Sequence, residues 1–143
     1  MKKLAIFFLI IIIIIVGISY MYLNYKANYY AVQKENKQFE SYHGQEIYGA
    51  ELATIINKAV DNNQNNQVEK DSKGKYINND NNSMTIDIKM LDNDKTYSME
   101  TLYSGGMDKF VQYYSEIKFR CVNLEYHKTT KKVKYMLFEQ ITE

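Results

Sequence analysis

One cysteine and two histidines are the residues of this 143-residue chain best suited to nucleophilic or metal chemistry. Cys121 and His127 lie six residues apart in one predicted strand, so both side chains can point to the same face. Each strand residue rises roughly 3.3 Å, so about 20 Å separates them and they cannot form a nucleophile–base pair. We interpret Cys121 as a buried structural thiol, with a reactive or intermolecular-disulfide role as the alternative.

Metal binding has little support in the sequence. His43 has no companion ligand nearby, and a zinc site needs three or four converging side chains. Asp92-Asn93-Asp94 followed by Thr96 is similar to the opening of a calcium-binding loop. The glycine and the bidentate glutamate of that loop are missing, and Tyr103 stands where the glutamate belongs. We therefore predict a hairpin turn at residues 92–95, and neither a metal site nor a cofactor site.

Two further groups of residues have types suited to catalysis or anion binding. Ser104-Gly105-Gly106 opens a predicted helix and could bind an anion through free backbone amides. It lacks both a Walker lysine and the third glycine of a dinucleotide-binding loop, so we interpret it as a helix start. The remaining carboxylates of interest are scattered and unpaired in sequence: Glu100, Glu116, Glu125 and Glu139. The sequence predicts no catalytic residue and a protein that is not an enzyme.

A run of twenty uncharged residues, 4–23, precedes all of these groups. At 1.5 Å per residue such a helix covers the roughly 30 Å of a bilayer's hydrocarbon core. Lys2 and Lys3 precede the run and tyrosines follow it, which favours a single-pass helix with a cytoplasmic N-terminus. Lys26, Lys34 and Lys37 weaken this charge asymmetry. We predict a cytoplasmic tip at 1–3, a transmembrane helix at 4–23 and an extracytoplasmic remainder.

The alternative interpretation of the apolar run is a cleaved signal peptide. Gly17-Ile18-Ser19 would be an acceptable cleavage site. The apolar residues continue past it to Leu23 without a polar segment, which favours an uncleaved anchor over a secreted form. Both interpretations place the folded part outside the cytoplasm.

The helical pattern continues beyond the apolar run into a predicted juxtamembrane stalk, residues 24–43. One stripe recurs at steps of three and four residues: Tyr25, Tyr29, Val32, Asn36 and Phe39. The stripe can form a homodimer seam, in which Asn36 would specify register, or it can pack on the chain's own domain. Because two heptads are few, we favour packing on the domain.

Residues 44–143 are predicted to form one α+β domain, of two helices and two β-hairpins that build an antiparallel sheet. The first helix has apolar residues at helical spacing from Ala50 onwards and ends at Asp61. The second begins at Ser104 as its N-cap. The predicted strands are 84–90, 96–103, 119–127 and 133–140. One buried face is assigned to Phe119, Cys121, Val133, Tyr135 and Leu137.

Composition limits the partners of this domain. Excluding Lys2 and Lys3, 16 basic residues stand against 17 acidic ones, and no basic block is interleaved with aromatics. Nucleic-acid binding therefore has no support. The fourteen tyrosines reflect either codon bias or an aromatic surface suited to binding. We predict a membrane-anchored protein that contacts the lipid bilayer and binds another protein of the cell envelope.

A loose motif extends this prediction. The pattern Asn36-x-x-Phe39-x-x-Tyr42-x-Gly44-x-x-x-x-Gly49, followed by an amphipathic helix, resembles small signal-anchored proteins of low-GC Gram-positive bacteria. That group implies no activity for the residues here. The order of apolar helix, stalk and α+β domain also resembles type IV pilin-like subunits, which makes a pilin or pseudopilin the alternative function. No Gly-Phe processing site precedes the apolar run, however, and the first acidic residue is Glu35.

Overall fold

The computed structural model describes residues 2–142, and the chain divides into two compact units between Lys34 and Glu35. Helix α1, Lys2–Glu40, passes through this boundary. Its apolar part has a mean hydropathy of 3.0 over eighteen residues, and none of those residues is buried. The helix is thus long and apolar enough to cross a membrane, and its place near the N-terminus also fits a signal sequence.

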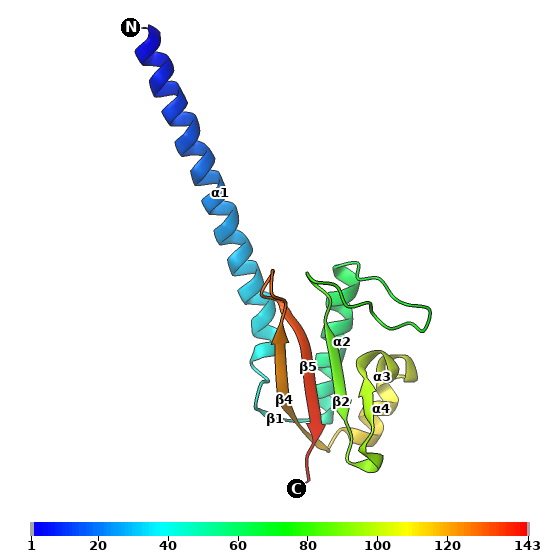
Figure 1. Ribbon diagram of the computed structural model, residues 1–143. Helices are drawn as coiled ribbons and strands as arrows, with labels where there is room; N and C mark the ends of the chain where they lie inside the picture. The colour runs from blue at the N-terminus through cyan, green and yellow to red at the C-terminus, as the bar shows by residue number, and fades with distance from the viewer. Residues whose placement is uncertain (1, 143) are drawn as a thin grey trace. The chain divides into compact units, whose positions relative to one another are not determined.

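The second unit is an α+β domain, as the sequence predicts, built on a five-stranded sheet (Figure 1). The strands are β1 (Glu46–Tyr48), β2 (Thr85–Lys89), β3 (Thr96–Ser98), β4 (Lys118–Tyr126) and β5 (Val133–Gln140). Their order in the sheet is β1-β4-β5-β2-β3. The two predicted hairpins, β2–β3 and β4–β5, are present and antiparallel.

The sheet is mixed, whereas the sequence analysis predicts an antiparallel one. Strands β2 and β5 join the two hairpins and run parallel, with Ile86 beside Met136 and Ile88 beside Phe138. The connection from β2 to β5 contains strand β3, helices α3 and α4, and strand β4, so the chain has the length that a parallel pairing requires. Strand β1, which was not predicted, adds a short antiparallel edge to β4.

Three helices cover one face of the sheet: α2 (Gly49–Asn65), α3 (Met99–Gly105) and α4 (Met107–Tyr114). The predicted apolar face of α2 is confirmed, because Leu52, Ile55, Ile56, Ala59 and Val60 are all buried. In Figure 1, α2 runs behind the strands. The core between α2 and the sheet includes Ile86, Ile88, Phe119, Met136 and Phe138, each fully buried.

The segment 96–106 differs from the prediction. The second strand of the first hairpin ends at Ser98, and α3 begins at Met99 instead of continuing as a strand to residue 103. Met99 is fully buried and Leu102 packs against the core, which is the i, i+3 spacing of a helix. Ser104 lies inside α3, and Gly106 with φ +97° separates α3 from α4. Ser104 is therefore not a helix N-cap.

A bulge in the second hairpin accounts for two wrong burial assignments, those of Tyr135 and Leu137. Glu125 pairs with Tyr135 and Tyr126 with Val133, so Lys134 is an extra residue on β5. The insertion changes which residues of β5 face the core: Met136 and Phe138 are buried, whereas Tyr135 and Leu137 lie on the opposite face. Phe119, Cys121 and Val133 are buried as predicted.

Candidate functional site

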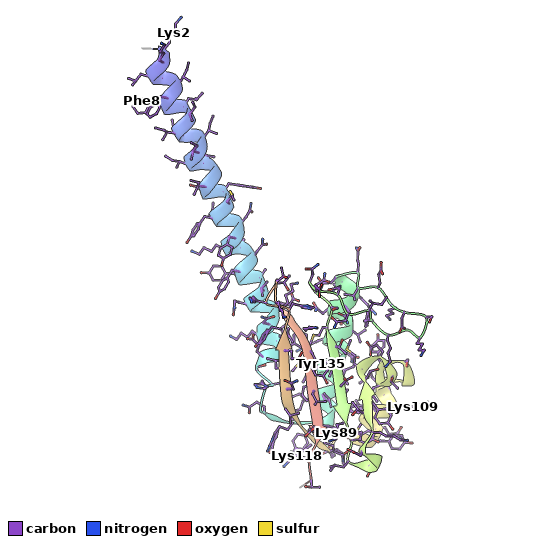
Figure 2. The ribbon with its side chains drawn as sticks, viewed as in Figure 1. Lys2, Phe8, Lys89, Lys109, Lys118 and Tyr135 are labelled. Atoms are coloured by element: carbon purple, nitrogen blue, oxygen red, sulfur yellow. The ribbon has the colours of Figure 1, made fainter. Side chains whose placement is uncertain are left out.

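The face of the sheet opposite the helices, here called the open face, is a polar surface built from four of the five strands. Its side chains alternate along each strand with the buried ones and are half-buried or exposed. They are Glu46 and Tyr48 on β1; Lys118, Arg120, Asn123 and Glu125 on β4; Tyr135, Leu137 and Glu139 on β5; and Thr85, Asp87 and Lys89 on β2. Figure 2 labels Tyr135, Lys89 and Lys118 along their strands.

A row of alternating charges crosses four strands of the open face. Glu46 lies opposite Arg120, Arg120 opposite Glu139, and Glu139 opposite Lys89. Glu46 and Arg120 form an ion pair, and Lys89 Nζ lies 3.9 Å from Glu139 Oε1 and 3.5 Å from Asp94 Oδ1. Opposite charges on directly paired residues stabilise neighbouring strands modestly. The row leaves this part of the surface almost neutral yet rich in donors and acceptors.

Tyr135 marks the other end of the open face. Its hydroxyl donates a hydrogen bond of 3.2 Å to Asp87 Oδ2. Partial burial, together with the nearby carboxylates of Asp87 and Glu125, raises the pKa of Tyr135 to about 12, so the phenol stays protonated at neutral pH. A surface hollow of about 290 Å³ adjoins this tyrosine, and its other lining residues include Thr85 and Lys134. The site can donate and accept hydrogen bonds.

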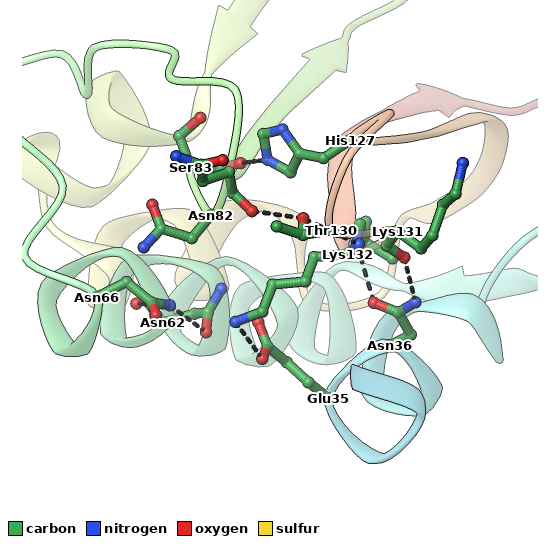
Figure 3. A network of polar contacts seen from close by, with 12 residues as sticks. Glu35, Asn36, Asn62, Asn66, Asn82, Ser83, His127, Thr130, Lys131 and Lys132 are labelled. Carbon is green, nitrogen blue, oxygen red and sulfur yellow. Dashed lines mark hydrogen bonds and ion pairs between the residues drawn. The ribbon is translucent and has the colours of Figure 1, made fainter. Parts of the chain in front are cut away.

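A polar network fixes the end of the domain at which β2 and β5 begin (Figure 3). The buried Asn36 side chain donates to Lys131 O (2.7 Å) and accepts from Val133 N (2.9 Å). Asn63 makes the same pair of bonds to the backbone of Met84, at 2.7 and 2.8 Å. The two central parallel strands therefore both start at a buried asparagine amide, which supplies the hydrogen bonds that their backbone would otherwise lack.

The same network contains His127, the second histidine of the chain. His127 is buried, and its Nε2 lies 2.7 Å from Ser83 O. Nearby, Thr130 Oγ1 donates to Asn81 O at 2.6 Å. These bonds attach the loop at residues 78–83 to the β4–β5 turn. His127 thus has a structural partner, and it lies away from Cys121 along β4.

The structure places Cys121 in the core, on strand β4. It is fully buried and its Sγ lies 3.5 Å from Asn123 O. Burial raises the pKa of the Cys121 thiol to about 11, so almost no thiolate forms at neutral pH. The arrangement agrees with a structural thiol and gives no support to a nucleophile.

The other residues considered for chemistry lie apart from one another. His43 is exposed beside the edge of β4, and residues 92–94 form a short 3₁₀ turn, with Asp94 at φ +49°. Glu100 Oε1 accepts a hydrogen bond from Tyr76 N at 3.2 Å, whereas its Oε2 is buried without a partner among the described residues. Within residues 2–142, no three His, Cys, Asp or Glu side chains are placed to hold a metal ion.

Asn36 and Asn63 are the structurally important residues whose roles were underestimated from sequence. Asn36 was recognised on the stalk stripe, where one expected role was to set the register of a dimer. The structure buries Asn36 and Phe39 within the domain, as the favoured alternative predicts for these two residues, whereas Tyr25 and Tyr29 of the same stripe are exposed. Asn63 lies beyond Asp61, where the sequence predicts that α2 ends, whereas the helix extends to Asn65. Its position seven residues after Ile56, on the apolar face of the helix, was the available signal.

The chain was compared with protein-family models, with curated proteins and with solved structures. None of these comparisons gave a significant match.

Proposed function

We propose that this is a non-enzymatic, membrane-anchored protein whose open face binds another protein of the cell envelope. The observation that supports the proposal is the alternating row of charges from Glu46 to Lys89 on a sheet face that no helix covers. The open face combines charges of both signs with the side chains of Tyr48, Tyr135 and Leu137. Such a surface is typical of a protein–protein interface, whereas a polyanion or an anionic lipid surface would call for a mainly positive one. The partner would carry a complementary row of mixed charges.

The apolar part of α1 supplies the anchor in this proposal. It is long enough to span a bilayer, and its basic N-terminal tip favours a domain outside the cytoplasm. Retention of this helix would tether the domain to the membrane. That restriction raises the effective concentration of the domain for other membrane proteins.

Topology can be tested with one engineered thiol. We expect a Ser72→Cys chain to react with a membrane-impermeant maleimide in intact cells, because residue 72 is exposed in a loop. The unmodified chain should remain unlabelled, since its only thiol is buried and its pKa of about 11 makes thiolate attack at least roughly 100-fold slower than for a free cysteine. Labelling of both chains after denaturation is the control. Labelling of Ser72→Cys only after lysis would place the domain in the cytoplasm.

Binding by the open face can be tested with a photoreactive amino acid at Leu137, near the centre of that face. We expect ultraviolet light to attach a second protein at this position in intact cells. The same probe at Gln112, exposed on α4, should give no such product. A charge reversal, Lys89→Glu, should weaken the Leu137 product because it disrupts the alternating row. Equal products at both positions, or none at Leu137, would contradict the proposal.

A further inference from the structure

We propose that the turn between β4 and β5 binds the anionic headgroups of the membrane that holds the apolar helix. The turn is His127-Lys128-Thr129-Thr130-Lys131-Lys132, and Lys134 follows it. The inference rests on the membrane anchoring included in the proposed function and adds a second contact with the bilayer. It does not depend on the open face or on a protein partner.

The charge of this turn differs from that of the rest of the domain. Residues 128–134 contain four lysines and no acidic residue, although residues 35–143 as a whole carry 14 basic and 17 acidic side chains. Lys132 Nζ is paired with Glu35 at 2.8 Å. Asp80 and Glu125 line a hollow of about 470 Å³ together with Lys128 and Lys134. Lys128 and Lys131 are the exposed lysines of the turn, and Lys131 does not line this hollow.

The turn is held in one conformation by its contacts with the start of the domain. Asn36 bonds the backbone on both sides of Lys132, and His127 N donates to Lys132 O at 2.9 Å. Lys131 adopts a φ of +60°, which a lysine rarely takes without support from its surroundings. Figure 3 shows the turn against the helix that carries Glu35 and Asn36. The lysines are thus presented by a rigid backbone.

Chain connectivity keeps the turn within electrostatic range of the bilayer. Residues 24–35 are helical and cover about 18 Å beyond the end of the apolar run at Leu23. A headgroup layer takes up roughly 5–7 Å of this length, which leaves at most roughly 11–13 Å, or about one and a half Debye lengths at physiological salt. Because the turn is bonded to Glu35 and Asn36, it cannot move far from the point where the chain enters the domain. Lysines at this range are attracted to anionic lipid.

The test uses the full chain carrying a fluorophore at Thr129→Cys, reconstituted in vesicles of phosphatidylcholine with or without phosphatidylglycerol. In the anionic vesicles we expect a blue-shifted emission and weaker quenching by acrylamide, a neutral quencher. Salt at about 0.5 M should remove both effects, because it shortens the Debye length to roughly 4 Å. Flotation of the labelled chain with both kinds of vesicle reports anchoring separately, so a failure to dock is distinguishable from a failure to anchor.

Two matched variants decide whether these lysines are responsible. The first variant changes three lysines of the turn region to Gln: Lys128, Lys131 and Lys134. We expect it to abolish the blue shift. Lys132 is kept because it pairs with Glu35. The control variant removes the same charge from exposed sites elsewhere by changing Lys73, Lys95 and Lys109 to Gln. It should leave the blue shift unchanged. The proposal is overturned if both triple variants behave alike, if the lipid composition has no effect, or if soluble heparin protects the label equally in neutral vesicles.

Discussion

Gly49→Ala is expected to destabilise the domain by at least about 3 kcal/mol. A Cβ atom at this position would lie 1.9 Å from Tyr114 O and 2.7 Å from Tyr114 C. These are backbone atoms at the end of α4, so relief requires that α2 and α4 move apart. Gly49 N also donates to Ile117 O at 2.8 Å, which fixes the two segments at this separation. Position 49 therefore requires a glycine, because the backbones of α2 and the end of α4 approach too closely to admit a Cβ atom.

The measurement is urea unfolding of the full chain in detergent micelles, followed by circular dichroism. Gly105→Ala is the matched control, because Gly105 is also helical and a Cβ there meets no atom within 4 Å. The control should change the free energy of unfolding by less than about 0.5 kcal/mol or stabilise slightly. If both variants unfold at the same urea concentration, the contact between Gly49 and Tyr114 is not as tight as described.

Asn36→Ala is expected to cost about 2–4 kcal/mol of the free energy of unfolding. The substitution leaves Val133 N and Lys131 O without their partners at the start of a central strand. A buried backbone group without a hydrogen bond costs more than the bond itself contributes. The loss should also loosen the β4–β5 turn, which Asn36 holds.

The same unfolding experiment tests this prediction with two comparison variants. Gln38→Ala lies on the exposed side of the same helix and should have little effect. Asn36→Asp keeps an oxygen that accepts from Val133 N but turns a second, acceptor-only carboxylate oxygen toward Lys131 O in a buried site, so we expect a loss at least as large as that of Asn36→Ala. A loss for Asn36→Ala no larger than that for Gln38→Ala would contradict the role assigned to the amide.

Local patterns in the sequence were sufficient for most elements of this fold. The period of 3.6 in 50–60 and the period of two in 84–90 each specify an element whose apolar face is buried, so α2 and β2 were predicted correctly. The segment 96–106 was harder because α3 is only seven residues long. A strand and a short helix give similar apolar spacing over so few residues, and the packing of Met99 decides between them.

The open face was predicted only in part. The alternation on β2 placed Asp87 and Lys89 away from the core, but the bulge at Lys134 reversed the expected directions of Tyr135 and Leu137. A one-residue insertion moves every later side chain of the strand to the opposite face. The local sequence around Lys134 contains no pattern that predicts such an insertion. The row from Glu46 to Lys89 further depends on strand order, which brings together residues far apart in the chain.

Composition and short-range periodicity were enough to predict the apolar helix and the α+β class, and the sequence contains no recognisable catalytic motif. The tertiary structure decided three things: the parallel contact between β2 and β5, the placement of Asn36 and Asn63 at the starts of those strands, and the faces of Tyr135 and Leu137. These features depend on pairings between distant segments. Buried backbone N–H and C=O groups need hydrogen-bond partners, and the tertiary fold decides which residues lie close enough to supply them. The residues adjacent in sequence do not reveal these partners.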